Sequence, residues 1–470
     1  MTIYVLRHGE SIGNERQIVQ GQDFDPGLTE TGREQARNVA GDLTEERSGP
    51  ATLRSSPARR AQETATIIGE TLGEDIVVES TLREVDPGII AGVSKSLLGS
   101  RFPEYLDVWE ARGDLDPIPR AESGDEAQAR ALLVLDRLAE SPGDHIVVSH
   151  AAFNRYLLNT ARGVGRTTAV GHEPTRLHTL SDPLDGVEIE GISGGTHSEI
   201  RRLETNETTY VLKRDSHIDE GELSFHAWVS DYVNSKRPLL PDVLAWEDSD
   251  GTGREVLAHS QGEHRYGPLP SDRARRLCHR VADLAVFLRQ ANRDFGLETL
   301  PDRIQRIVTA TADPAIAALG RQILEKPIMR PERQTTCVHY DLHRDNLLFG
   351  EKSITLLDLS GFCRAPPAFQ PASLFMAGFL LEDVSDFALE EYTAYWPHPV
   401  NRDRLLMLMV ARAYIGVGFF DRRQREDGLT PSEADIHSRY VHAIHRIVDS
   451  LPDWSLPAGF PSPKPRGNRS

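Results

Sequence analysis

The sequence predicts two domains of different class: an α/β domain with a mostly parallel sheet flanked by helices over residues 1–180, and an α+β domain over residues 187–455. A chain of 470 residues is too long for one ordinary hydrophobic core. In the first 150 residues, short apolar runs alternate with helical stretches, which is the order of a parallel sheet covered by helices. From residue 187, several strands follow one another before long helices begin, which is typical of an α+β domain.

Composition and charge indicate a soluble globular protein. Hydrophobic residues make up 39% of the chain and charged residues 26%, and no stretch approaches the roughly 18 apolar residues of a membrane span. The net charge of −18 argues against nucleic acid as a partner, because a phosphate backbone needs a basic surface. Three scattered cysteines without metal-like spacing, and a first strand that begins at Thr2 or Ile3 with no secretory leader before it, favour a reducing cytoplasm.

The first strand ends in residues that can hold and attack a phosphate group. The apolar run at residues 4–6 stops at Arg7-His8-Gly9, and ligands bind at the carboxyl ends of parallel strands. The planar fork of Arg binds phosphate, and an imidazole can carry a phosphoryl group covalently. Gly9 has no Cβ and lets the backbone approach a ligand closely. We therefore expect His8 to be the centre of a phosphoryl-transfer site.

Helix signals follow this strand. Thr31, with Glu34 at the capping-box spacing, is the predicted N-cap of a helix that runs to about Leu43. A second helix begins near Arg59 and Arg60, where free N–H groups and the helix dipole favour an anion.

Strands and loops of this half supply further polar groups. Strands are predicted at residues 53–55 and 77–78, and a strand at residues 146–148 ends in His150, as the first strand ends in His8. Glu84 lies in a loop between these strands, ahead of a long helical region that begins at residues 122–124. The order of these groups predicts that they meet at one edge of the parallel sheet.

These motifs resemble the histidine phosphatase superfamily, the phosphoglycerate-mutase-like group, over about residues 1–180. They occur in the family's order: Val5-Leu6-Arg7-His8-Gly9-Glu10-Ser11, Ser56-Pro57-Ala58-Arg59-Arg60-Ala61-Gln62-Glu63-Thr64-Ala65, Leu82-Arg83-Glu84 and Val148-Ser149-His150. The resemblance implies that His8 becomes phosphohistidine and that Glu84 protonates the leaving oxygen. The implied phosphate pocket, which needs no cofactor, consists of Arg7, Asn14, Arg60 and His150.

The first half departs from that family in two places. The family has a Gly-aromatic-Glu-Gly segment after the acid that helps to shape the substrate mouth, whereas this chain has Gly88-Ile89-Ile90-Ala91-Gly92. After His150, the sequence leaves little room for a full final strand and helix, and residues 164–186 have the composition of a short linker. A phosphatase is favoured over a mutase, because the insertions that mutases carry around the acid are missing.

The second half predicts a β-meander followed by long helices. Strands are expected at residues 187–190, 199–203 and 208–213, with a Gly-rich turn at Gly194 and Gly195, and a further strand at residues 256–258. Lys213, on the third strand, would face the phosphates of a nucleotide. Helices are expected around Glu222 and over residues 270–292.

The stretch around residues 337–359 is the most specific pattern of this half. Asp341 is followed five residues later by Asn346, and Asp358 ends the next strand. The first carboxylate can accept a hydroxyl proton, while the other two side chains offer hard oxygen ligands to magnesium.

This half resembles the aminoglycoside and choline phosphotransferase family, which has the two-lobed protein-kinase-like fold, over about residues 187–450. The resemblance rests on His339-x-Asp341-x4-Asn346, Asp358, Val211-Leu212-Lys213 and the placement of Glu222. It implies that Lys213 pairs with Glu222 and holds the phosphates of ATP, or of another nucleoside triphosphate. It also implies Asp341 as the base, with Asn346 and Asp358 as the Mg²⁺ ligands.

The second half has departures of its own. Tyr340 stands where relatives have Gly, and residues 366–372 lack the Asp that braces the catalytic loop in relatives. Residues 405–410 predict packed core of the larger lobe, and the Pro-rich tail at residues 456–470 predicts disorder.

Together the two halves predict a bifunctional cytoplasmic enzyme that removes a phosphoryl group at one site and adds one from ATP at the other. Its partners would be small phosphorylated and hydroxylated molecules, such as sugars, aminocyclitols, nucleosides or amino alcohols in a biosynthetic pathway, and not nucleic acid or membrane. Three alternatives stay open. One domain could be an inactive ligand sensor that regulates the other, the two activities could oppose each other on one regulatory metabolite, or the second domain could phosphorylate protein.

Overall fold

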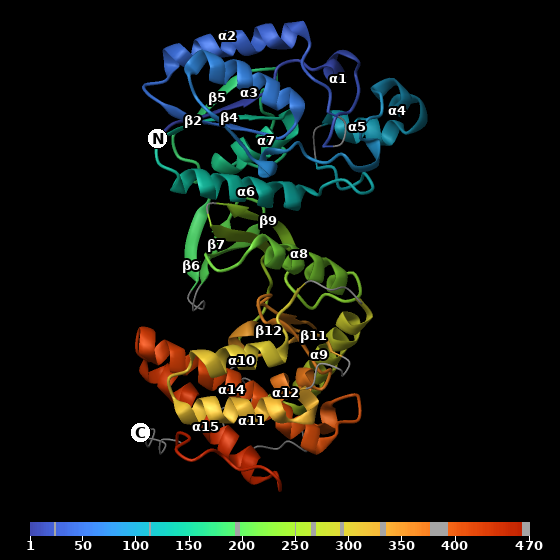
Figure 1. Cartoon of the computed structure of the whole chain (residues 1–470). Helices are drawn as coiled ribbons and strands as arrows, with labels where there is room; N and C mark the ends of the chain where they lie inside the picture. The colour runs from blue at the N-terminus through green and yellow to red at the C-terminus, as the bar shows by residue number, and fades with distance from the viewer. Residues whose placement is uncertain are drawn as a thin grey trace. The chain divides into compact units, whose positions relative to one another are not determined.

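The computed structural model describes residues 1–22, 25–111, 114–192, 198–249, 251–264, 269–291, 296–329, 335–376 and 393–462. It divides into two compact units, residues 1–227 with 242–259 and residues 228–241 with 260–470, and each unit is described by itself. Figure 1 traces the chain through both. Among the helices of the described segments, none is both long and apolar enough to cross a membrane.

A five-stranded, mostly parallel sheet forms the centre of the first 180 residues. Its strand order is β3-β2-β4-β1-β5. Four strands are parallel: β1 (Ile3–Arg7), β2 (Ala51–Ser55), β3 (Ile76–Val78) and β4 (Asp144–Ser149). The predicted α/β class is confirmed, and nearly all residues of β1 and β4 are buried because helices cover both faces of the sheet.

Helices pack on both faces of this sheet, and alternate strand residues face the two resulting cores. The side chains of Tyr4 and Leu6 share a core with α2 (Glu30–Glu46) and α3 (Arg59–Leu72). Those of Ile3 and Val5 share the other core with two helices, α6 (Gly124–Glu140) and α7 (Ala151–Ala161). Three short helices lie outside these layers: α1 (Ile12–Glu15), α4 (Lys95–Arg101) and α5 (Pro103–Ala111).

Two expectations for this region were wrong. The N-cap of α2 is Thr29, whose hydroxyl accepts the N–H of Gly32, and not Thr31. The domain is also complete after His150, because α7 follows at once and β5 (Leu177–Leu180) pairs antiparallel with β1 inside the predicted linker. The sequence pattern missed β5 because this strand has only four residues, of which just one is fully buried.

The second sheet is antiparallel, with the order β6-β7-β8-β10-β9. Its strands are β6 (Glu188–Ile192), β7 (Ser198–Glu204), β8 (Thr209–Asp215), β9 (Val243–Ser249) and β10 (Thr252–Ala258). The strands predicted around residues 187–213 and 256–258 are confirmed, whereas β9 was missed. The helix predicted around Glu222 is α8 (Glu220–Asn234). Gly194 and Gly195 lie outside the described residues.

Helix α6 is a core element for both sheets. Every residue of α6 from Ala127 to Leu138 is buried, as expected for a helix covered on all sides. One face, with Ala131 and Leu135, packs in the core of the first sheet. The other face, with Leu132 and Leu133, packs against the second sheet, at Leu212 and Val256 among others.

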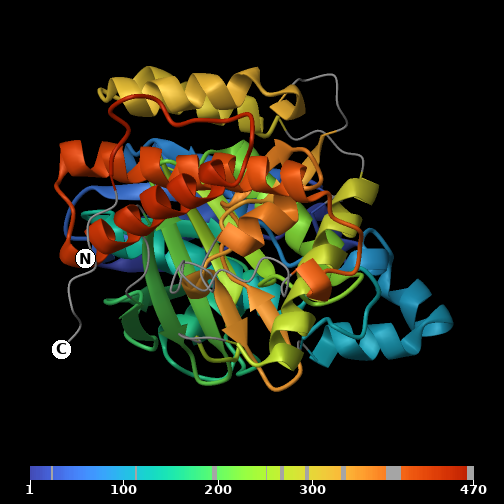
Figure 2. The ribbon, with the colours of Figure 1, turned by 90° about the horizontal axis from the view of Figure 1, so that it is seen from below.

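The second unit is mainly helical. Its helices are α9 (Ser271–Ala291), α10 (Leu300–Ala310), α11 (Pro314–Glu325), α12 (Phe369–Met376), α14 (Arg402–Glu426) and α15 (Pro431–Asp449). Two small antiparallel pairs accompany them, β11 (Thr336–His339) with β14 (Phe362–Ala365), and β12 (Leu347–Phe349) with β13 (Ile354–Leu356). Helices α14 and α15 lie side by side (Figure 2), and most of residues 405–410 are buried in α14, as expected for lobe core.

The C-terminal segment differs from the expectation of disorder in the part that is described. Phe460 is buried, and its ring centroid lies 5.7 Å from that of His445 on α15. The imidazole Nε2 of His445 lies 2.9 Å from the carbonyl oxygen of Pro461. One aromatic side chain therefore anchors residues 457–462, while residues 463–470 lie outside the described residues.

The packing of α6 between two sheets makes a testable stability prediction. Leu133→Ala should lower the free energy of unfolding by about 2–5 kcal/mol, because it opens a cavity between α6 and the second sheet. Leu97→Ala on α4 is the matched control, since Leu97 is 49% exposed and its loss should change the free energy by less than about 0.5 kcal/mol. Urea unfolding followed by circular dichroism compares the two, and equal effects would contradict the shared core.

Candidate active sites

The carboxyl ends of three parallel strands bring the predicted groups of the first half together. The ladder continues one residue past each strand end, because the N–H of His8 donates to the carbonyl of Ser149 and the N–H of Ser56 donates to that of Val148, both at 3.0 Å. His8, Ser56 and His150 therefore lie on the same edge of the sheet. The ring centroids of the two histidines are 5.2 Å apart.

The hydrogen bonds of His8 identify the ring nitrogen that carries the lone pair. Nδ1 lies 2.7 Å from the carbonyl oxygen of Gly9, and since a carbonyl only accepts, Nδ1 must carry the proton. Nε2 is then unprotonated and accepts a hydrogen bond from Nε of Arg60 at 3.2 Å. His8 is only 2% exposed, so its surroundings fix the ring. Nε2 is therefore the ring nitrogen of His8 that carries the lone pair.

Arg60 is the buried cation of the site and is 1% exposed. It donates through Nη2 to the carbonyl of Gly21 at 3.1 Å and to Nδ1 of His150 at 3.2 Å. Because Nδ1 of His150 accepts, its proton lies on Nε2, which donates to the hydroxyl of Ser56 at 2.7 Å. Arg60 also pairs with Asp25 at 3.3 Å. One guanidinium thus orients both imidazoles.

Arg7 and Asn14 complete the predicted phosphate pocket. Arg7 donates to the backbone carbonyl of His172 at 2.7 Å. Asn14 accepts, through its side-chain oxygen, from the backbone and the hydroxyl of Ser11, which turns its amide NH₂ to other partners. Both side chains line the same cavity as His8, Arg60 and Glu84.

Glu84 is held by backbone donors at the start of α7. One carboxylate oxygen accepts from the N–H groups of Val85 and Phe153, each at 3.0 Å. Phe153 lies in the first turn of α7, where N–H groups have no partner within the helix. These bonds fix the carboxyl group of Glu84 through one of its two oxygens.

Burial and neighbouring cations keep both histidines neutral. Burial is the largest cause that holds the pKa of His8 well below 6.5, and Arg60 and Arg7 add to it. The pKa of His150 is lowered in the same way by burial and by Arg60. An unprotonated imidazole beside two guanidinium groups is the state that can attack a phosphate.

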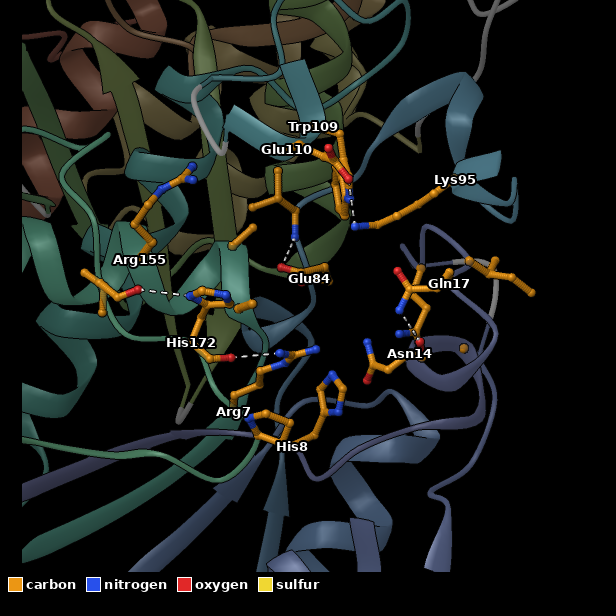
Figure 3. Close-up of a pocket in the computed structure, with 18 of the residues that line it drawn as sticks. Arg7, His8, Asn14, Gln17, Glu84, Lys95, Trp109, Glu110, Arg155 and His172 are labelled. Atoms are coloured by element: carbon orange, nitrogen blue, oxygen red, sulfur yellow. Dashed lines mark hydrogen bonds and ion pairs between the residues drawn. The ribbon is translucent and has the colours of Figure 1, made fainter. Parts of the chain in front are cut away.

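The side chains of Arg7, His8, Asn14, Arg60 and Glu84 line one cavity of about 660 Å³, whereas the predicted pocket residue His150 is not among its lining residues. Figure 3 shows Arg7, His8 and Asn14 at one end, Glu84 near the middle, and Lys95, Trp109 and Glu110 at the far end. Arg155, one turn into α7, and His172 also line the cavity. The sequence reasoning missed Ser56, Arg155 and the residues of the far end, although the position of Arg155 five residues after His150 offered a signal. In the atypical segment at residues 88–92, Ile90 is packed in the core.

In the second sheet, the partly buried Lys213 lies beside a buried pair of charged side chains, His226 and Glu255. Lys213 on β8 stands opposite Glu255 on β10, and Glu255 accepts from His226 Nδ1 at 2.6 Å. Glu222 lies 3.7 Å from the other ring nitrogen. Burial alone lowers the pKa of His226, but Glu255 and Glu222 outweigh it and raise the pKa to about 9. The sequence reasoning missed His226 and Glu255, and a direct pair between Lys213 and Glu222 stays a prediction.

In the second unit, Asp341, Asn346 and Asp358 come together. The Asn346 amide donates to the backbone carbonyl of Asp341 at 3.0 Å. The N–H of Leu357 donates to the carbonyl of Asn346 at 2.9 Å, which puts the next residue, Asp358, beside Asn346. His339, fully buried, lies with Nε2 2.5 Å from the carbonyl oxygen of Asp358.

The carboxylate of Asp341 is oriented by two basic side chains. Arg412 donates to Oδ1 at 2.9 Å and His343 Nε2 lies 3.4 Å from Oδ2. Burial alone raises the pKa of Asp341, but His343 and Arg412 outweigh it and hold the pKa well below its ordinary range. Burial lowers the pKa of His343, but the nearby Asp341 carboxylate has the larger effect and raises the pKa of that imidazole to about 10.

Gln370, within the segment at residues 366–372 that lacks the expected Asp, braces the backbone at His339. Its side chain accepts the N–H of His339 at 2.9 Å and donates to the carbonyl of His339 at 2.8 Å. Tyr340 is accommodated by Arg303, which lies 4.2 Å from the ring centroid and donates to the hydroxyl at 2.5 Å. Arg412 donates to the Tyr340 carbonyl at 2.6 Å. Residues 339–341 are therefore bound by the side chains of Gln370, Arg303 and Arg412.

The side chains of Asn346 and Asp358 fit a hard divalent cation. The amide nitrogen of Asn346 is used by the carbonyl of Asp341, so the amide oxygen is the atom presented elsewhere. An amide oxygen and a carboxylate are ligands that Mg²⁺ accepts, usually with phosphate oxygens and water completing the shell.

The neutral state of His8 can be tested by NMR. With histidines labelled at Cε1, the His8 resonance, assigned by its loss in His8→Gln, should not titrate between pH 8 and pH 6, because burial, Arg60 and Arg7 disfavour the imidazolium. A His8 midpoint at or above 6.5 would contradict the assigned state.

The brace at Gln370 can be tested by unfolding. Gln370→Ala should lower the free energy of unfolding by about 1–3 kcal/mol, because it removes the hydrogen-bond partners of the buried N–H and carbonyl of His339. Gln305→Ala, at an exposed position on α10, is the matched control and should cost less than about 0.5 kcal/mol. Chemical denaturation measures the free energy of unfolding of both variants. A Gln370 variant as stable as the control would show that Gln370 does not stabilise the loop.

Comparison with known proteins agrees with both resemblances. Residues 3–190 match the family model described as histidine phosphatase superfamily (branch 1), and residues 188–405 match that of the phosphotransferase enzyme family. The putative phosphoserine phosphatase 2 of Hydrogenobacter thermophilus is 31% identical over 165 residues, which cover 35% of this chain and 79% of that protein. The bifunctional protein Rv2228c of Mycobacterium tuberculosis is 33% identical over 165 residues, and the match covers 35% of this chain but only 44% of that protein.

Among solved structures, the amicoumacin kinase hAmiN in complex with AMP-PNP, Ca²⁺ and Ami superposes with a TM-score of 0.47 at 10% identity, covering 57% of this chain and 90% of that chain. Family membership rests on the sequence matches. The chain belongs to the histidine phosphatase superfamily through its first domain, and a domain of the phosphotransferase enzyme family is fused to it.

Proposed function

We propose that the first domain is a phosphomonoesterase that works through a phosphohistidine on Nε2 of His8. One observation carries the proposal: the lone pair of a buried, neutral imidazole lies in a cavity with two guanidinium groups, Arg7 and Arg60, and a carboxyl group, Glu84. The arginines neutralise the charge of a bound phosphate and of the transferring phosphoryl oxygens. The similarity of this domain to the putative phosphoserine phosphatase 2 of Hydrogenobacter thermophilus is consistent with this chemistry.

The reaction takes two steps. Nε2 of His8 attacks phosphorus, the bond between phosphorus and the ester oxygen breaks, and Glu84, entering protonated, gives its proton to the departing alkoxide. Water then attacks the phosphohistidine, Glu84 takes up a proton from that water, and the P–N bond breaks to release phosphate and regenerate His8. The positive charge of His8 during the intermediate is shared by the Nδ1–H bond to Gly9.

We propose that the second domain transfers a phosphoryl group from ATP, or another nucleoside triphosphate, to a hydroxyl of a small molecule. Asp341 would accept a hydrogen bond from the attacking hydroxyl and take its proton as the new P–O bond forms. Its lowered pKa suits a loose transition state, in which orientation matters more than basicity. Lys213 and Glu222 would serve the nucleotide phosphates. Mg²⁺, held through Asn346 and Asp358, would neutralise phosphate charge.

Together, the two domains would form a bifunctional cytoplasmic enzyme. It would act on small metabolites such as sugars, aminocyclitols, nucleosides or amino alcohols. The brace at Gln370 favours an active second domain over an inactive ligand sensor. The alternative in which the two activities oppose each other on one regulatory metabolite involves the same residues and differs only in the substrates.

Two substitutions separate the activities. His8→Ala should lower phosphomonoester hydrolysis by about 10³-fold or more, because it removes the nucleophile, and should leave ATP-dependent phosphorylation unchanged. Asp341→Asn should do the reverse. Hydrolysis of 4-nitrophenyl phosphate and transfer from [γ-³²P]ATP to a pooled set of hydroxylated metabolites measure the two reactions.

Each variant serves as the folding control of the other, because each should keep one activity. If His8→Ala hydrolyses the ester at the wild-type rate, the phosphohistidine route is wrong. If Asp341→Asn still transfers phosphate from ATP at the wild-type rate, the role of Asp341 is wrong.

A further inference from the structure

Helix α6 carries charged side chains where it is buried. Asp136 is 1% and Arg137 4% exposed, and Arg130 is 8% exposed. A buried charge is costly unless it is paired and hydrogen-bonded. Asp136 and Arg137 pair with residues of the second sheet, at Arg214 and Glu247. Arg130 instead binds the segment at residues 81–83 and Glu122.

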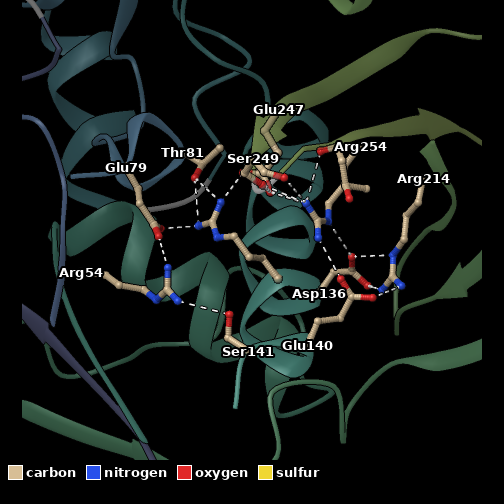
Figure 4. Close-up of polar contacts among 12 residues, drawn as sticks. Arg54, Glu79, Thr81, Asp136, Glu140, Ser141, Arg214, Glu247, Ser249 and Arg254 are labelled. Carbon is tan, nitrogen blue, oxygen red and sulfur yellow. Dashed lines mark hydrogen bonds and ion pairs between the residues drawn. The ribbon is translucent and has the colours of Figure 1, made fainter. Parts of the chain in front are cut away.

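Arg137 lies between two carboxylates that come from different domains. Its Nη2 pairs with Glu79, directly after the third strand of the phosphatase sheet, and its Nη1 pairs with Glu247, on β9 of the phosphotransferase sheet. Glu79 also pairs with Arg54 on β2. Figure 4 shows this chain of charges from Arg54 through Glu79 to Glu247. All are buried or nearly so, so solvent does not screen the contacts.

The same helix holds the segment that leads to the acid Glu84. Arg137 donates to the hydroxyl of Thr81 from both terminal nitrogens, at 3.4 and 3.3 Å. Arg130, two turns earlier on α6, donates to the carbonyls of Thr81 and Arg83 at 2.8 and 2.7 Å. Arg130 also lies 4.2 Å from the ring centroid of Phe153, whose N–H binds Glu84.

We propose that Glu247, a residue of the phosphotransferase sheet, is a positioning residue for the phosphatase acid Glu84 and acts through Arg137 on the segment at residues 79–84. The inference rests on the proposed role of Glu84. Without the charge of Glu247, Arg137 keeps Glu79 as its main carboxylate partner and shifts toward it, so that the grip on Thr81 changes. A general acid must lie within hydrogen-bond reach of the leaving oxygen, and a displacement of about 1 Å costs up to about 100-fold in rate.

Glu247 is not needed simply to hold the second sheet on α6. Arg214 on β8 pairs with Asp136 and Glu140, and Arg254 on β10 donates to Glu140 at 2.8 Å. The apolar contacts of Leu132 and Leu133 add to these pairs. The distinctive contact of Glu247 is therefore its pair with the arginine that grips the acid segment.

The test compares two substrates of similar shape that differ in their need for a proton. The 4-nitrophenolate ion leaves without protonation at neutral pH, whereas phenolate leaves poorly without it. The measured quantity is the ratio of kcat/KM for phenyl phosphate to kcat/KM for 4-nitrophenyl phosphate in the full chain. Partial unfolding lowers both values equally and leaves the ratio unchanged, so a merely structural role does not move it.

Glu247→Gln should lower this ratio about tenfold. Glu190→Gln is the matched control, because Glu190 lies on β6 of the same sheet in an exposed pair with Arg202, and its ratio should stay at the wild-type value. Glu84→Gln sets the full effect of losing the acid. If Glu247→Gln does not fold, Thr81→Val removes the hydroxyl that Arg137 grips and should lower the ratio in the same way.

The outcomes separate the inference from the proposed function. If Glu84→Gln lowers the ratio while Glu247→Gln and Thr81→Val keep the wild-type value, the positioning role is overturned and the phosphatase mechanism stands. If Glu84→Gln also keeps the wild-type ratio, the acid role itself fails, and the inference fails with it.

Discussion

The pair of bonds from the Arg60 guanidinium to His8 and His150 is the interaction on which the first site depends. A guanidinium always donates, so both imidazoles must present a lone pair to it, and the proton of each ring is sent to the opposite nitrogen. The sheet makes this possible, because parallel strands end at one edge and bring residues 8, 56 and 150 together. Burial and the two neighbouring arginines then keep both imidazoles neutral, because a nearby positive charge disfavours the imidazolium.

Helix α6 packs against both sheets. A helix that serves one sheet can expose its other face, but α6 is buried on both and carries ions that pair on both sides. Alternate residues of the second sheet point to opposite faces. Arg254 faces α6, while its neighbour Glu255 binds His226 on α8. Helix α6 thus contacts the segment that leads to Glu84 on one side and the sheet that carries Lys213 on the other.

The sequence predicted the groups that end strands, such as Arg7, His8 and His150, because an abrupt change from apolar to polar residues is a local signal. It also predicted Asp341, Asn346 and Asp358 from their spacing. It missed contacts between distant segments: Arg137 and Glu247 are 110 residues apart, and no local pattern joins them. Gln370 was missed for another reason, since an amide can replace the bracing carboxylate, which only its hydrogen bonds to His339 reveal. The N-cap shifted from Thr31 to Thr29 because two threonines compete within one turn.

The measurement that tests the central claim most directly is the identification of the phosphorylated atom. Rapid quenching of the wild-type chain in alkali during turnover of 4-nitrophenyl phosphate, followed by ³¹P NMR and peptide mass spectrometry, should find a single phosphoryl group on Nε2 of His8. A phosphoryl group on Nδ1, on another residue, or none at all under conditions that preserve phosphohistidine, would contradict the account.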